Sequence, residues 1–161
     1  MGWVTLTVRK QSLKRQHNDY ELQLLEISHS RRQLSRGKQS ELSLMNYDKQ
    51  TEIENLKDST GYSEYKEEYQ QALKDGDKES VSEAAQAYSA AKADFDEQKE
   101  YVTQYYDNES EELESETTER ENDLDEEQTQ IEAIIESISQ EIESVGQQIS
   151  SDIQGSTIQL K

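Results

Sequence analysis

Glu26 and His29 are the two residues whose types and spacing come nearest to a reactive site in this sequence. A Glu-x-x-His spacing puts a carboxylate and an imidazole on one face of a helix, as in helical bundles that bind two metal ions. Such a site needs further ligands, and the neighbouring Arg31 and Arg32 carry charges that repel a cation. We therefore expect no metal at this pair.

The residues for other common enzyme chemistries are also missing. The sequence has no cysteine and two histidines, His17 and His29, and it contains no glycine-rich phosphate-binding motif. His17 falls on a helical repeat and is expected to serve packing. We predict a non-enzymatic protein that uses no cofactor.

The composition limits the fold. In 161 residues, 36 acidic side chains face 17 basic ones, for a net charge of −19, and hydrophobic residues make up 30% of the chain. This hydrophobic content is low for a globular core, and together with the high net charge it approaches the composition of disordered chains. Proline is absent and glycine occurs six times, so long helices are equally permitted.

Apolar residues at alternating spacings of three and four favour the helical interpretation, because that spacing marks the seam of a coiled coil. Two runs carry the pattern, and Gly61 and Gly76 interrupt the chain between them. The first includes Leu13, Tyr20, Ile27, Leu34, Leu42, Ile53 and Leu56; the second includes Val81, Tyr88, Phe95, Val102, Leu124, Ile131, Ile138 and Val145.

The pattern predicts one elongated all-α domain. Residues 3–8 alternate polar with β-branched or apolar side chains, which is typical of a strand. The end of the chain has a similar short alternation. We expect an extended N-terminal segment over 1–8, helices over 9–58, 62–75 and 78–154, and an extended C-terminal tail over 155–161.

We expect the two long helices to form an antiparallel helical hairpin, a coiled coil with a kink near Gly61 and a turn at Gly76. In that register Leu13 lies opposite Ile138, and the tyrosines at 62, 65 and 69 face the alanines between 84 and 91. A basic cluster also falls opposite the acidic segment 107–127, where cations relieve like-charge repulsion. This intrachain charge register comprises Arg31, Arg32, Arg36, Lys38, Glu112, Glu116 and Glu119.

The end of the hairpin that carries both termini is predicted to be the interface. If the first helix starts at residue 9, the part of the helix over 78–154 that lies beyond Ile142 has no helical partner. The isoleucines of that part then stay uncovered. The expected interface residues are Trp3, Val4, Leu6, Val8, Ile142, Val145, Ile149, Ile153, Ile158 and Leu160.

These features predict a structural subunit that self-associates, or docks with other assembly proteins, in a filament, sheath, secretion system or virion. The alternative is an acidic adaptor, chaperone or scaffolding protein that binds a basic partner through residues 107–127. The net charge of −19 argues against nucleic acid as a partner. We expect no membrane span and no cleavable signal, which leaves a cytoplasmic protein or one exported without such a signal.

Overall fold

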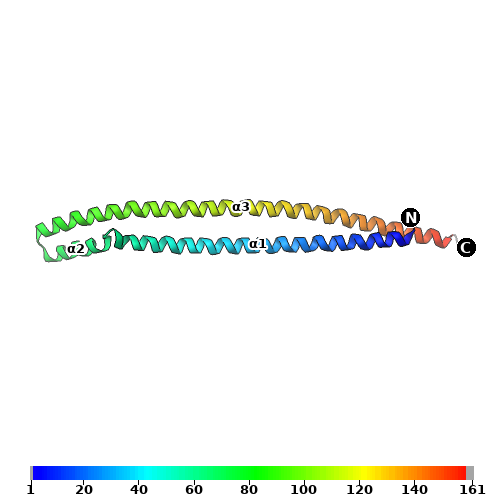
Figure 1. Cartoon of the computed structure of the whole chain (residues 1–161), viewed down its shortest axis with the longest axis horizontal. Coiled ribbons are helices and arrows are strands. Elements are labelled where there is room, and N and C mark those ends of the chain that lie inside the picture. The colour runs from blue at the N-terminus through cyan, green and yellow to red at the C-terminus, as the bar shows by residue number, and fades with distance from the viewer. Residues whose placement is uncertain (1, 159–161) are drawn as a thin grey trace. The chain divides into compact units, whose positions relative to one another are not determined.

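The structure is a computed structural model that describes residues 2–158. Three helices account for it: α1 (Trp3–Ser59), α2 (Tyr62–Asp75) and α3 (Lys78–Ile158), labelled in Figure 1. The described residues contain no strand. The predicted all-α fold class is confirmed.

The extended ends predicted from the alternating pattern are wrong where the structure describes them. Residues 3–8 form the start of α1, and residues 155–158 form the end of α3, while residues 159–161 lie outside the described residues. The helix is favoured because it buries Leu6, which is 4% exposed, one heptad before the buried Leu13. Burial of that side chain outweighs the strand preference of Val4, Thr5 and Val8.

The chain divides into two compact units. Unit 1 runs up to Ser35 and resumes at Thr117, and unit 2 runs from Arg36 to Glu116. Each unit therefore contains one part of α1 and one part of α3, and unit 2 also contains α2.

The core of unit 1 is a single apolar layer between α1 and α3. Leu6 and Leu13 of α1 form a buried cluster with Ile138 and Val145 of α3. Within each pair the members are seven residues apart, which is the repeat by which two helices keep one seam in contact. Tyr20, Ile142 and Ile149 pack against this cluster.

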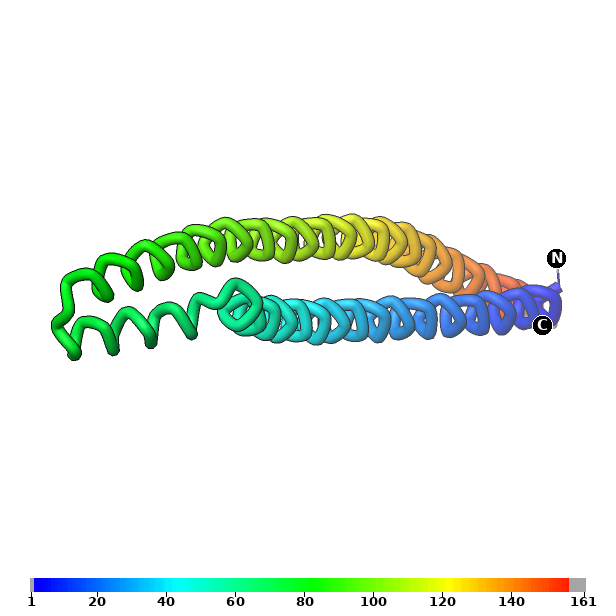
Figure 2. Tube along the Cα trace, turned by 60° about the vertical axis from the view of Figure 1, so that its left-hand side comes forward, coloured from blue at the N-terminus to red at the C-terminus, as the bar shows by residue number. Residues whose placement is uncertain are grey.

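The two helix segments of unit 1 run in opposite directions. Arg9 pairs with Glu141 and Arg31 pairs with Asp125, so the partner number in α3 falls as the number in α1 rises. Figures 1 and 2 both show the blue start of α1 beside the orange part of α3.

Aromatic rings and an ion pair join the helices of unit 2. The ring of Tyr62 stacks on Phe95 with centroids 4.7 Å apart, and Tyr69 stacks on Tyr88 at 5.7 Å. Tyr62 and Tyr69 thus meet aromatic rings on the inward face of α3, which also holds the buried Ala91. Nζ of Lys49 lies 2.8 Å from Oδ1 of Asp107.

Two glycines separate the helices of unit 2. Gly61 and Gly76 have φ values of 68° and 75°, a left-handed conformation that other residues adopt at a steric cost. The N–H of Gly76 donates to the carbonyl oxygen of Ala72 at 3.0 Å, which closes the last turn of α2. Asp77 then caps the start of α3, since its Oδ2 accepts hydrogen bonds from the N–H and Oγ of Ser80 at 3.1 and 2.6 Å.

Candidate interaction surfaces

Glu26 and His29 lie on the exposed side of α1 in unit 1. Nε2 of His29 lies 2.9 Å from Nε2 of Gln33, so a neighbouring side chain on the same helix occupies one ring nitrogen in a hydrogen bond. Residues 2–158 contain no group of three or more His, Asp or Glu side chains placed to bind a metal ion.

Two tyrosines of unit 2 have pKa values shifted by their surroundings. Partial burial, and then a hydrogen bond that its hydroxyl donates to Glu52 at 3.1 Å, raise the pKa of Tyr106. A hydrogen bond with Tyr62, together with desolvation, raises the pKa of Tyr88. Both causes favour the protonated phenol, so these groups act as hydrogen-bonding members of the packing.

The predicted charge register is distributed over both units. In unit 1, Arg31 pairs with Asp125, and the Nε of Arg32 donates to the carbonyl oxygen of Ser28. Arg36 is exposed and Lys38 is half-buried in unit 2. The predicted glutamates are all exposed, and none forms an ion pair with another residue of the described part of the chain: Glu112, Glu116 and Glu119.

The predicted interface residues fall into buried and exposed sets. Leu6 and Val145 are 4% and 2% exposed, and Ile142 and Ile149 pack against them. The expectation that residues beyond Ile142 lack a helical partner is therefore wrong for Val145 and Ile149, because α1 begins at Trp3 and its Leu6 packs in the same cluster. Ile158 ends α3, and Leu160 lies outside the described residues. The residues that stay largely exposed are Trp3, Val4, Val8 and Ile153.

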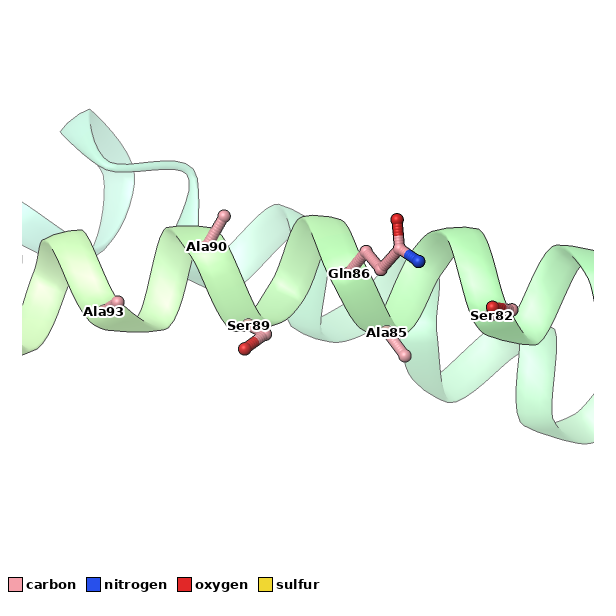
Figure 3. A pocket seen from close by; sticks show the side chains of 6 residues that line it. All are labelled: Ser82, Ala85, Gln86, Ser89, Ala90 and Ala93. Carbon is pink, nitrogen blue, oxygen red and sulfur yellow. The ribbon is translucent and has the colours of Figure 1, made fainter.

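A surface of small side chains lies on α3 in unit 2. Figure 3 shows the six residues around it, and all six project from one helix, so the surface has no opposing wall. Alanine and serine at these positions leave the backbone of α3 close to the surface. The residues are Ser82, Ala85, Gln86, Ser89, Ala90 and Ala93.

Two further sets of exposed apolar side chains were not predicted from the sequence. On α1 in unit 1, Leu22 and Leu25 are 58% and 64% exposed, and on α3 in unit 2, Tyr101 and Tyr105 are 73% and 51% exposed. A signal for both exists in the sequence, because Leu22 and Leu25 lie three residues apart and Tyr101 and Tyr105 lie four apart, and such spacings place side chains on one face of a helix.

Comparisons with protein-family models, with curated proteins and with solved structures find no match to this chain. In the part of the chain that the structure describes, none of the helices combines the length and apolar character that crossing a bilayer requires.

Proposed function

We propose that the protein is a non-enzymatic structural subunit: a coiled-coil helical hairpin that self-associates, or docks through its terminal end, in a larger assembly. One observation carries the proposal. Large apolar side chains stay exposed where α1 begins in unit 1, with Trp3 at 50%, Val4 at 57% and Val8 at 62%. Apolar side chains gathered on a polar chain mark surfaces that bind other proteins.

The packing within each unit supports the hairpin. In unit 1 the ion pairs of Arg9 and Arg31 run antiparallel along α3, and in unit 2 the contact of Lys49 with Asp107 joins the same two helices. Two helices bury one stripe each, which gives a monomer little apolar area with which to offset the entropy of ordering. Association with further helices adds buried area and stabilises the fold.

The first experiment is size exclusion with light scattering across protein concentration, with circular dichroism on the same fractions. We expect helical particles of defined multiplicity, or particles that grow with concentration. A helical monomer at every concentration would contradict the proposal.

A double variant tests whether the exposed residues carry the association. Val4→Ser with Val8→Ser removes apolar surface while keeping small side chains, and it should shift association to at least about tenfold higher concentration. Thr5→Ser with Gln11→Ser is the matched control, since both residues are exposed and polar on the same helix. Equal association of the two variants would reject the start of α1 as the interface.

The exposure of the acidic segment favours a second candidate function, an acidic adaptor that binds a basic partner through residues 107–127. In unit 2, Glu111, Glu112 and Glu116 are exposed, and in unit 1, Glu119 and Glu121 are exposed. Such a surface attracts cations at long range and loses that attraction in salt.

Titration with a lysine-rich helical peptide at low and at high salt separates this candidate from the first. Tight binding that salt abolishes, together with a monomeric chain, would support the adaptor. Binding that is weak at both salt concentrations would reject it.

A further inference from the structure

The outward side of α1 in unit 1 carries a second repeat, distinct from the seam. Leu22 and Leu25 are 58% and 64% exposed, although each lies within five residues of the buried Ile27. Arg15 stands one heptad before Leu22, and Arg32 stands one heptad after Leu25. Residues at such spacings share one face of a helix. We call Arg15, Leu22, Leu25 and Arg32 the outer α1 face.

The outer α1 face carries two arginines in an acidic protein. In the three-and-four repeat that links these residues the intervening positions hold Asn18 and His29, and the exposed carboxylates of Asp19, Glu21 and Glu26 lie beside the repeat. Arg15 and Arg32 are exposed, and neither forms an ion pair with a residue in 2–158. Two exposed leucines between two unpaired cations form a surface suited to an acidic helix with apolar side chains at its centre.

A face with this chemistry exists on α3 in unit 2. Tyr101 and Tyr105 are 73% and 51% exposed, one turn apart. Asp94 stands one heptad before Tyr101, and Glu112 stands one heptad after Tyr105. Both carboxylates are exposed, and neither forms an ion pair within the described residues. We call Asp94, Tyr101, Tyr105 and Glu112 the outer α3 face.

The outer α3 face borders a groove. The groove has a volume of about 460 Å³ and lies between α1 and α3 within unit 2. Asp94, Glu97 and Tyr101 line it together with the apolar side chains of Leu56 and Val102. Its lining is therefore acidic with an apolar floor, which suits a side chain that carries a cation on an apolar stem.

We propose that the outer α1 face of one copy docks on the outer α3 face of a second copy. The proposal rests on the proposed self-association and adds a second contact between copies to the one at the start of α1. Arg15 and Arg32 are 17 residues apart and Asp94 and Glu112 are 18 apart, or about 26 and 27 Å along their helices. When the leucines pack on the tyrosines, each arginine meets a carboxylate. Each pattern reads the same in both directions, so this pairing holds for parallel and antiparallel docking.

The contact joins unlike surfaces. A copy that uses one of its outer faces leaves the other available to a further copy, which is the geometry by which one interface builds larger assemblies. The charges act mainly on partner selection and on the association rate, and the leucines and tyrosines supply the apolar burial.

Charge reversal tests the pairing. Arg15→Glu with Arg32→Glu should weaken self-association at least about tenfold, and so should Asp94→Lys with Glu112→Lys, because each puts like charges in contact. The chain that carries all four substitutions exchanges the charges of the two faces and should recover wild-type association within about threefold. Circular dichroism on each variant checks that the helices are intact.

Two controls match the changes in net charge. Lys74→Glu with Lys78→Glu makes the same change as the arginine reversals, and Glu67→Lys with Glu68→Lys makes the same change as the carboxylate reversals, all at exposed positions off both faces. The controls should associate like the wild type. A fourfold variant that stays as weak as either pair would overturn the docking geometry.

The results also separate this proposal from the proposed function. A wild-type chain that is monomeric at every concentration would reject both the proposed structural subunit and the docking of the two outer faces. A wild-type chain that self-associates, while both pairs of reversals leave association unchanged, keeps the structural subunit and rejects these two faces. Reversals that weaken association no more than the matched controls would likewise reject the faces, since net charge alone would then explain the loss.

Discussion

The ammonium group of Lys10 lies against the backbone of α3 at Gly146, where an added Cβ would come within 3.0 Å of its Nζ. The neighbouring atom is the end of a flexible side chain, which can move aside. Alanine stabilises a helix interior by about 0.5–1 kcal/mol relative to glycine. We expect Gly146→Ala to raise the free energy of unfolding by slightly less than this, measured by thermal and urea melts.

Gly37→Ala is the control for that measurement. Gly37 lies within α1, and nothing is within 4 Å of a Cβ added there. It should show the full gain in helix propensity, so the difference between the two variants reports the free energy of moving Lys10. If Gly146→Ala destabilises the protein while Gly37→Ala stabilises it, Lys10 is held in place rather than free to move.

Asp77 makes stability depend on pH at the start of α3. The hydrogen bonds from the Oγ and N–H of Ser80 lower the pKa of the Asp77 carboxyl below its ordinary value. A lowered pKa in the folded state means that the carboxylate stabilises the fold above the unfolded-state pKa, and that this contribution is lost as the pH falls through the folded-state value. Asp77→Ala should therefore lower the melting temperature at neutral pH and have a smaller effect in acid.

Asp77→Asn provides the comparison, because it keeps a hydrogen-bond acceptor without a titrating group. It should melt between the wild type and Asp77→Ala at neutral pH, and its melting temperature should change less than that of the wild type on acidification. Equal acid sensitivity of the wild type and Asp77→Asn would remove Asp77 as a source of pH dependence.

The helical class and the inward-facing layers were predictable because they follow from local rules. A chain without proline and with apolar residues at three-and-four spacing forms helices, and the heptad then pairs Leu13 with Ile138 in one cluster. Gly61 and Gly76 separate the helices because both adopt a left-handed backbone.

The state of residues 3–8 was not predictable from local pattern. Their alternation is typical of a strand, and the helix is favoured by burial of Leu6 against Val145, a residue far away in the sequence. The outer faces were missed for a different reason. Leu22 and Tyr101 lie outside the seam positions, and their exposure is known only once the seam is assigned.

Leu6 tests whether the first turns of α1 stabilise the fold. The side chain is 4% exposed in the cluster with Val145. Leu6→Ala should lower the free energy of unfolding by about 2–5 kcal/mol, the usual range for a buried leucine. Val4→Ala is the matched control, since Val4 is 57% exposed, and it should change stability by less than about 0.5 kcal/mol. Urea melts at low protein concentration provide the measurement, and equal small effects would show that residues 3–8 do not pack on α3.

Gly61 combines two constraints that a pair of variants can separate. Its φ is 68°, and a Cβ added there would come within 2.9 Å of Cε2 in the ring of Tyr65. Gly76 has a φ of 75° with nothing within 4 Å of an added Cβ, so it carries the backbone constraint alone. Gly76→Ala should destabilise the protein by about 1–2 kcal/mol, and Gly61→Ala should destabilise it more.

Adding Tyr65→Ser to both variants isolates the clash in a double-mutant cycle, because it should reduce the effect of Gly61→Ala and leave that of Gly76→Ala unchanged. Equal effects of the two alanines in the presence of Tyr65 would show that the ring moves away freely and that backbone conformation alone selects glycine at this break.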